Sequence, residues 1–351
     1  CRLLLDKGVD VNHVANSGGT ALMFAAGGGH LEASRLLLAR GADVNVAVLA
    51  TPDYIEQVAK GVAEGKEDVE PHKDGVTALS LAAQGGHLDL VHALVDAQAA
   101  VDVADEEDET PLLASFKNKH YNVSYYLLEH GANPNDVYVD DKRKMHSLLL
   151  DSVQLSNVPL ATLLVQRGAN LSVTDEEGVT PLIQAAYQGH NSLVMEMLSK
   201  GADITAANAE GINALIAAAS EGHADVVRTL LAHPQSDVNS KDNDGTNALM
   251  AAAVRGHKAV LLLLLEHKVD INAQNTDGHT ALMFAYNGKN QVETLLDKYS
   301  EYMKEMNGDS MKIIREAVQT HLDVVSLLLQ YGADASIKVS ALYCSVSSFI
   351  C

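Results

Sequence analysis

The chain has 351 residues and a formal net charge of −21, from 46 acidic and 25 basic side chains. So acidic a chain disfavours nucleic-acid phosphates and anionic membrane surfaces as partners, and no apolar run approaches the length needed for direct membrane insertion. The charge fits either a basic protein partner or the solubility of a long apolar chain. Only 4% of the residues are aromatic and none is Trp, so we expect a core of Leu, Ala, Val and Ile.

The three cysteines, Cys1, Cys344 and Cys351, lie near the ends of the sequence. They offer neither a disulfide framework nor the spacing of a zinc site, so we expect an intracellular, reducing compartment and no metal. Cytoplasm, nucleus and organelle interior stay equally open. The sequence starts with CRLLLDKGVDVN, which has the pattern of the second half of a repeat. We therefore expect a fragment or a processed chain that lacks its first half-repeat.

A phrase of about 33 residues recurs along the chain, and repetition at this period predicts a linear stack of small units. Its clearest copies are EGVTPLIQAAYQGHNSLVMEMLSKGADIT (Glu177–Thr205) and DGTNALMAAAVRGHKAVLLLLLEHKVDIN (Asp244–Asn272). We count a leading half-repeat and eight further repeats. One leucine in each clear copy sets the register, and the last four of them are 33, 34 and 33 residues apart: Leu22, Leu79, Leu112, Leu182, Leu215, Leu249 and Leu282.

Each copy predicts a turn, a first helix, a tight loop and a second helix. Thr180 and Thr280 are N-cap residues, and Pro181 follows at the first helical position, where no amide donor is lost. Paired alanines then allow neighbouring helices to approach closely. The second helix is predicted to end on a glycine in the left-handed conformation, at Gly131, Gly168, Gly201 and Gly332.

These residues resemble the ankyrin repeat family, from Cys1 to Ile337. The resemblance implies an all-α fold class, a solenoid of stacked helix–loop–helix units with protruding hairpin or loop fingers. We expect a single array over residues 1–337, with two helical insertions, and a C-terminal tail over residues 338–351. The tail either plugs the last repeat or is disordered.

The first interruption of the repeat is an insertion over residues 46–71. Thr51 and Pro52 have the pattern of a helix start, and Tyr54, Ile55 and Val58 begin an apolar stripe at helical spacing. We expect a helical finger whose apolar face packs either on the array or on a partner.

The second interruption is a degenerate repeat over residues 136–171, which lacks the Gly-x-Thr-Pro-Leu signature. Its basic cluster, Lys142, Arg143 and Lys144, is either a solvated loop or a receptor for carboxylates.

The third interruption covers residues 290–320. Tyr299 and Met303 belong to one apolar helical stripe, and a second stripe begins at Ile313. We expect a protruding helical hairpin that returns to the array at Leu322 and serves either partner docking or capping of the C-terminal face.

Two polar residue types recur at fixed repeat positions, which favours structural roles for both. In ankyrin repeats the recurring imidazole braces the adjacent hairpin backbone, so the resemblance implies that role for His30, His87, His120, His190, His223, His257 and His321. We interpret Asn12, Asn45, Asn239 and Asn272 as turn residues that bond their own backbone. The resemblance offers intracellular asparaginyl hydroxylation as the alternative.

An apolar residue commonly follows the register leucine, where the family usually has His. These side chains either pack between repeats or form an apolar inner surface for a partner. The residues at this position are Met23, Ser80, Leu113, Ile183, Ile216, Met250 and Met283.

Acidic finger tips should lie along one ridge, because equivalent positions of a stack are in register. Such a ridge would favour a partner bearing Lys or Arg. The partner-binding candidates combine these tips with residues of the insertions and one tyrosine of the repeats: Asp105, Glu106, Glu107, Asp108, Asp175, Glu176, Glu177, Asp242, Asp244, Tyr54, Ile55, Val58, Tyr187, Tyr299 and Met303.

No paired nucleophile and base, phosphate-binding loop or metal spacing stands out, so we expect no enzyme activity, no catalytic residues, no cofactor and no small-molecule substrate. The resemblance implies a scaffold that binds another protein through its concave face, acidic tips and insertions. The alternatives are the ankyrin portion of a larger multidomain enzyme or membrane protein, and a structural subunit of a large assembly.

Overall fold

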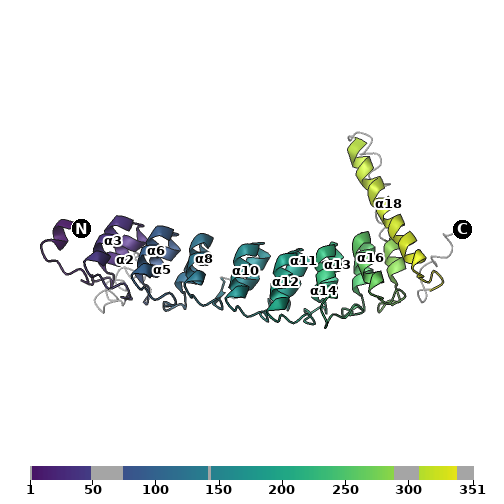
Figure 1. The fold of residues 1–351 in the computed structure, drawn as a ribbon, viewed down its shortest axis with the longest axis horizontal. Coiled ribbons are helices and arrows are strands. Elements are labelled where there is room, and N and C mark those ends of the chain that lie inside the picture. Colours follow the sequence, from purple (N-terminus) through teal and green to yellow (C-terminus); the bar gives the residue numbers. More distant parts are fainter. Residues whose placement is uncertain (1, 49–73, 141–143, 288–307, 338–351) are drawn as a thin grey trace, which may run out of the picture. The chain divides into compact units, whose positions relative to one another are not determined.

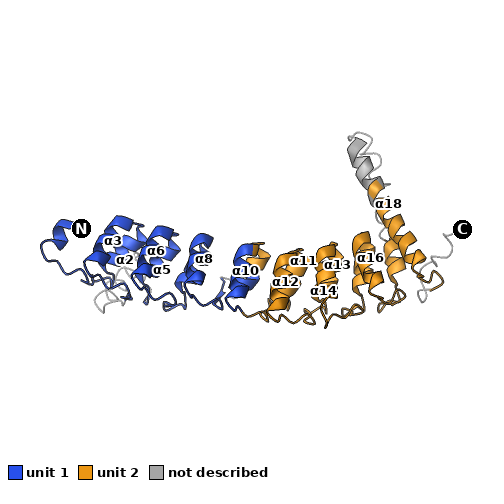
Figure 2. Cartoon of the chain, viewed as in Figure 1, with its two compact units in different colours: residues 1–151, 159–169 blue, residues 152–158, 170–351 orange. Residues whose placement is uncertain are grey.

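A computed structural model describes residues 2–48, 74–140, 144–287 and 308–337 of the chain (Figure 1). The chain forms two compact units, one of residues 1–151 with 159–169 and the other of residues 152–158 with 170–351 (Figure 2). Within each unit, helix pairs stack in sequence order. The expected all-α solenoid is therefore confirmed.

The first unit begins with a short helix, α1 (Arg2–Leu5). Three pairs follow, each with a first helix and a longer second helix: α2 (Ala21–Gly27) with α3 (Leu31–Ala39), α5 (Ala78–Gln84) with α6 (Leu88–Asp96), and α7 (Pro111–Lys117) with α8 (Tyr121–Glu129). The first helices pack on one another, α2 on α5 and α5 on α7, and the second helices do the same.

The degenerate repeat still forms a helix pair, α9 (Leu148–Gln154) and α10 (Val158–Gln166). An antiparallel hairpin of β1 (Val137–Val139) and β2 (Met145–Ser147) precedes it, with Tyr138 opposite His146. Although the signature is lost, this helix pair still has a leucine core. Four of its leucines are at most 2% exposed: Leu148, Leu149, Leu160 and Leu164. Of the basic cluster, Lys142 and Arg143 lie outside the described residues, and Lys144 is exposed.

The second unit contains three further pairs: α11 (Pro181–Tyr187) with α12 (Asn191–Ser199), α13 (Ala214–Glu221) with α14 (Ala224–Leu231), and α15 (Ala248–Arg255) with α16 (Lys258–Glu266). Residues 281–287 are also helical. The last described helix is α18 (Gly308–Gln330), which packs against α16 and α15.

The register leucines form the core, since all seven are at most 3% exposed. The residues that follow them are at most 8% exposed, which favours packing between repeats. The predicted capping is present at Thr180, whose hydroxyl accepts from the Ile183 amide at 3.3 Å. Asn213 and Asn247 cap α13 and α15 in the same way with a side-chain carbonyl.

Helix α18 differs from the hairpin that the sequence predicts. The first arm of that hairpin lies outside the described residues, whereas the second arm is continuous with the second helix of the last repeat, through His321 and Leu322. In five of the other repeats a glycine with positive φ precedes the histidine and forms the loop, as Gly256 does with φ 79°. Thr320 stands there in α18, and a β-branched residue disfavours that left-handed conformation, so the helix runs on.

The repeat asparagines connect one repeat to the next, which corrects the prediction that they bond their own turns. Asn239 Oδ1 accepts from the Asp270 amide at 2.8 Å. The bond within the turn comes instead from Asp237, whose Oδ1 accepts from the Asn239 amide at 2.9 Å. The sequence-local interpretation missed a partner that lies 31 residues ahead.

This asparagine bond also spans both insertions. Asn45 Oδ1 accepts from the Ala100 amide at 2.8 Å, 55 residues ahead, and Asn272 Oδ1 accepts from the Asp334 amide at 2.8 Å, 62 residues ahead. The inter-repeat bonding therefore resumes after each insertion. At the base of the first insertion, Val48 and Val76 pair through a 2.8 Å backbone hydrogen bond.

Three of the repeat histidines act as braces, but their acceptor is not the hairpin that the resemblance implied. Nε2 of the histidine faces a carbonyl oxygen near the end of the preceding repeat's first helix: His223 with Tyr187 at 2.9 Å, His257 with Ser220 at 2.9 Å and His321 with Val254 at 3.1 Å. Those carbonyls have no acceptor role inside their own helices, because they lie in the last turn.

Candidate functional site: a groove on the first helices of the second unit

The finger tips stack in register within each unit. In the first unit the Glu106 amide donates to the Asp74 carbonyl at 2.9 Å. In the second unit the same bond recurs between successive tips at 2.8–2.9 Å: Ala209 to Glu177, Asn243 to Glu210 and Thr276 to Asp244. The backbone thus fixes how closely the acidic side chains of neighbouring tips approach each other.

The first acidic residue of each tip closes its own turn. Asp242 Oδ1 accepts from the amides of Asp244 at 3.0 Å and Thr246 at 2.7 Å. Asp105 and Asp175 make the same pair of bonds. Asn208 makes it as well with its amide oxygen, so this position requires an acceptor and not a charge.

The remaining acidic candidates are exposed at the tips: Glu106, Glu107, Asp108, Glu176, Glu177 and Asp244. They are the side chains of the predicted ridge that a partner could reach most readily.

An open groove of about 350 Å³ lies between the first helices α11, α13 and α15 and the tips that precede them. Its apolar lining comes from Val179, Ile183, Ile212 and Ile216. Tyr187 at the end of α11 forms one wall and is 50% exposed.

The groove exists because small residues stand at one helix position in two successive repeats. Ala217 of α13 and Ala251 of α15 lie four residues after their caps, and both line the groove. Phe24 holds the equivalent position in α2 and is 59% exposed. A side chain of that size on α13 or α15 would fill the hollow.

Polar groups are confined to a few places on the groove lining. Gln184 of α11 and Asn208, Asp242 and Thr246 of the tips are lining residues. Asp242 is half-buried, and its Oδ1 accepts the turn hydrogen bonds from Asp244 and Thr246. A carboxylate at the edge of an apolar hollow favours a cationic group in a ligand.

The structure brings together two of the residues predicted from the sequence, Tyr187 and Asp242, in this groove. Tyr54, Ile55 and Val58 lie outside the described residues, as do Tyr299 and Met303. The sequence analysis did not predict five of the residues that line the groove: Gln184, Asn208, Ile212, Ala217 and Ala251. The signal that could have found them is alanine at the fourth residue after the cap in adjacent repeats.

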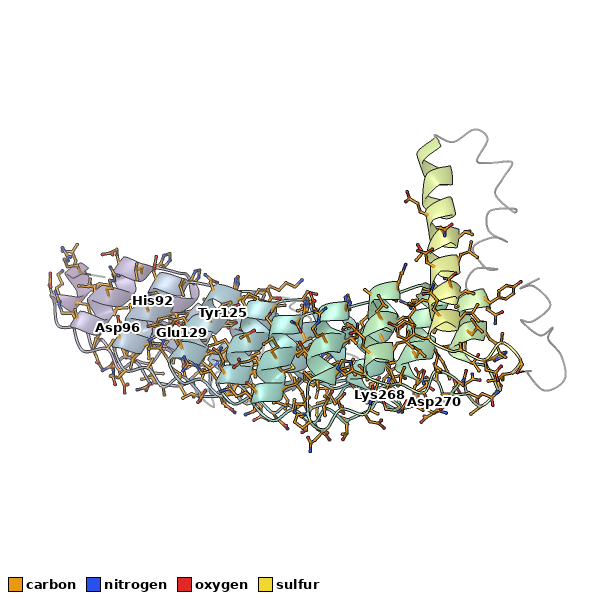
Figure 3. The ribbon with its side chains drawn as sticks, turned by 45° about the vertical axis from the view of Figure 1, so that its right-hand side comes forward. His92, Asp96, Tyr125, Glu129, Lys268 and Asp270 are labelled. Atoms are coloured by element: carbon orange, nitrogen blue, oxygen red, sulfur yellow. The ribbon has the colours of Figure 1, made fainter. Side chains whose placement is uncertain are left out.

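Ring side chains also gather on second helices of the first unit. The Tyr126 ring lies between His92 and His130, with centroid distances of 4.1 and 3.9 Å. Figure 3 shows His92 and Asp96 of α6 close to Tyr125 and Glu129 of α8. Burial, and then the charge of Asp96, raise the pKa of Tyr126 above its ordinary value. The tilted contact between the His92 and Tyr126 rings joins α6 to α8.

The described part of the chain contains no group of three or more His, Cys, Asp or Glu side chains placed to hold a metal ion. None of its helices combines the length and the apolar character that crossing a bilayer requires.

The repeat architecture is matched by the family model for ankyrin repeats (3 copies), at residues 1–48, 52–138, 149–242 and 234–306. The chain therefore belongs to the ankyrin repeat family. Ankyrin repeats are modules that bind other proteins.

Several curated proteins are similar to part of the chain. Ankyrin repeat and KH domain-containing protein mask-1 of Caenorhabditis elegans is 33% identical over 138 residues, which cover 36% of this chain and 5% of that protein. Ankyrin repeat and KH domain-containing protein 1 of Homo sapiens is 38% identical over 31% of this chain and 3% of its own length. Putative palmitoyltransferase ZDHHC13 of Danio rerio is 28% identical over 38% of this chain and 20% of its own length. The similarity thus spans a small share of each relative.

Proposed function

We propose that the chain is a non-catalytic scaffold that binds another protein through the groove of its second unit. The observation that carries the proposal is the apolar hollow of about 350 Å³ with a half-exposed tyrosine at its wall. Its volume is near the lower end of the roughly 300–1,000 Å³ typical of ligand sites. That size fits one or two anchoring side chains of a protein segment.

Tyr187 is the residue on which we expect most of the binding free energy to depend. Tyrosine is enriched among residues whose truncation weakens protein interfaces, because it buries a large ring with few rotatable bonds. A partner side chain between Tyr187 and Ile212 would bury apolar surface on both sides.

Charge favours a basic partner at the rim. Asp242 lines the groove, and exposed Glu177 and Asp244 belong to tips of the same unit. A Lys or Arg that flanks the apolar anchor would approach a surface rich in carboxylates, and its attraction would weaken as salt rises.

The experiment is selection of binding segments from a peptide library displayed on phage, followed by measurement of Kd for a selected peptide. We expect Tyr187→Ala to weaken binding by roughly 30-fold, the effect of a loss of about 2 kcal/mol. Tyr331→Ala is the matched control, because Tyr331 is 49% exposed and follows α18, away from the groove lining. Equal Kd values for the two variants would contradict the proposal.

A second candidate is that the array recruits partners for a larger protein, either a multidomain enzyme or a membrane protein, in an intracellular compartment. The small matched share of the relatives supports this candidate, as does the similarity to a putative palmitoyltransferase. Sequencing the complete transcript tests it, and imaging of a fluorescent fusion tests the compartment. A structural role in a large assembly would instead appear as a stable complex in size-exclusion chromatography of native extracts.

A further inference from the structure

A histidine lies between two carboxylates in the hairpin of the first unit. Nδ1 of His146, on β2, is 3.0 Å from Asp151 Oδ1, and Nε2 is 3.5 Å from Asp140 Oδ2. Asp151 on α9 is only 8% exposed. Nε2 of His146 is fully buried and has no hydrogen-bond partner, so the 3.5 Å approach to Asp140 is an ion-pair distance without a direct hydrogen bond.

Tyr138 on β1 completes the cluster. Its ring stacks on His146 with a centroid distance of 4.9 Å, and its hydroxyl donates to Asp151 Oδ2 at 2.8 Å. The Asp151 carboxylate thus has a donor on each oxygen, one from each strand. The hairpin is held against α9 through these two side chains.

The charges that face His146 from the neighbouring elements are mostly negative. Lys117 of α7 lies 5.9 Å from the centre of the Tyr138 ring and is paired with Glu109 at 3.0 Å, and the side chain of Lys144, on the hairpin itself, is exposed. Tyr121 of α8 faces Tyr138 as a further titratable group. His146 is therefore the group that can place a positive charge between Asp140 and Asp151.

Only the protonated imidazole satisfies both carboxylates. The neutral ring can donate through Nδ1 to Asp151, but its Nε2 lone pair would then face the Asp140 carboxylate. The imidazolium has a donor on each nitrogen and one positive charge between two negative ones. The hydrogen bond to Asp151 is the main cause that raises the pKa of His146 above 6.5, against the opposing effect of burial.

Asp140 also closes the turn of the hairpin, because its Oδ1 accepts from the Lys144 amide at 2.8 Å. We propose that protonated His146 is a latch that holds the β1–β2 hairpin against α9, and that loss of its proton at rising pH loosens the hairpin. The outward residues Val137, Val139 and Met145 are exposed, so the latch sets how rigidly this apolar ribbon is presented.

The direction of the pH effect follows from linkage. A histidine whose pKa is higher in the folded state stabilises the fold fully below its unfolded pKa of about 6.5. That stabilisation is lost as pH rises through the folded pKa. The hairpin is thus tightest in mildly acidic solution and loosest in alkaline solution.

Two measurements on the full chain test the latch. The first is titration of the histidine ring carbons by NMR, in which His146→Gln removes one signal and so assigns it. We expect His146 to titrate above 6.5, and Asp151→Asn and Asp140→Asn to move its midpoint down towards 6.5. Asp89→Asn, which removes an exposed carboxylate of α6 in the same unit, should leave the midpoint unchanged.

The second measurement is the ratio of amide exchange rates in the hairpin to those in α6. Taking this ratio cancels the intrinsic pH dependence of exchange. We expect the protection of the β1–β2 amides to fall relative to α6 from about pH 6 to about pH 9, where a histidine of raised pKa loses its proton. His146→Gln should make this ratio independent of pH. If that variant does not fold, Asp140→Asn, at the turn, should still flatten the ratio. A midpoint at or below 6.5, or a flat ratio in the unmodified chain, would overturn the proposal.

Discussion

The histidine braces allow a matched test of what one bond between repeats contributes to stability. His257 and His190 occupy the same repeat position and precede α16 and α12. His257 Nε2 donates to the Ser220 carbonyl at 2.9 Å, whereas His190 Nε2 is buried without a partner. The Gln154 carbonyl is the equivalent acceptor for His190, and it accepts from the Gln188 side chain instead, at 3.1 Å. Replacing either ring by alanine removes similar packing, but only His257→Ala removes the hydrogen bond.

The expected difference follows from the energetics of buried hydrogen bonds. The lost bond contributes about 0.5–1.5 kcal/mol, and a stranded polar partner adds up to about 1–3 kcal/mol when it is buried. Ser220 is only half-buried, so water offsets part of the second cost. We therefore expect His257→Ala to destabilise the repeat by about 1–2 kcal/mol more than His190→Ala does.

Local hydrogen exchange is the suitable assay, because repeat arrays open in parts and a single unfolding free energy is poorly defined. We expect His257→Ala to accelerate exchange of the α13 and α15 amides. This acceleration should be roughly 5–30-fold larger than the one that His190→Ala causes in the repeats around His190. Equal acceleration in the two variants would refute the assignment of His257 as a brace.

Two further predictions concern pH and a strained backbone position. Burial is the main cause that lowers the pKa of both His190 and His257, so the stability that depends on them is complete above about pH 6.5 and is lost as pH falls through their lowered folded-state pKa values. Local exchange of the α12 and α16 amides, corrected for the intrinsic rate, at pH 5 and pH 7.5 would show it, and higher protection at pH 5 would contradict it. Lys268, labelled in Figure 3, follows the C-cap of α16 and has φ 60°. Gly201 holds the same position after α12 and has φ 87°. Because a left-handed conformation costs a side chain about 1–2 kcal/mol, Lys268→Gly should slow local exchange in α16, and Gly201→Ala should accelerate it in α12. Faster exchange in α16 of Lys268→Gly would count against this explanation.

The fold could be predicted from the sequence because it depends on contacts that repeat. A buried leucine such as Leu182 every 33 or 34 residues fixes the register, and a cap such as Thr180 fixes where the first helix begins. The hydrogen bond that the Asp270 amide donates to Asn239 was not predicted, because turn patterns in a sequence relate only residues that are close along the chain.

The candidate site was predicted in part. The sequence predicts Tyr187 and Asp242 as partner-binding residues, yet the groove depends equally on the small size of Ala217 and Ala251. A hollow arises from what adjacent repeats leave empty, and no single repeat reveals it. The turn role of Asp242 had a signal in the sequence, because Asn208 stands at the same position without a charge.

The central claim is that a partner segment occupies the groove of the second unit, and methyl NMR tests it most directly. Labelled isoleucine methyl groups would be recorded with and without a peptide selected on the unmodified chain. We expect the signals of Ile183, Ile212 and Ile216 to shift on binding, while the signal of Ile204, which is buried outside the groove lining, does not. Binding that leaves the three groove signals in place and shifts only signals elsewhere would contradict it.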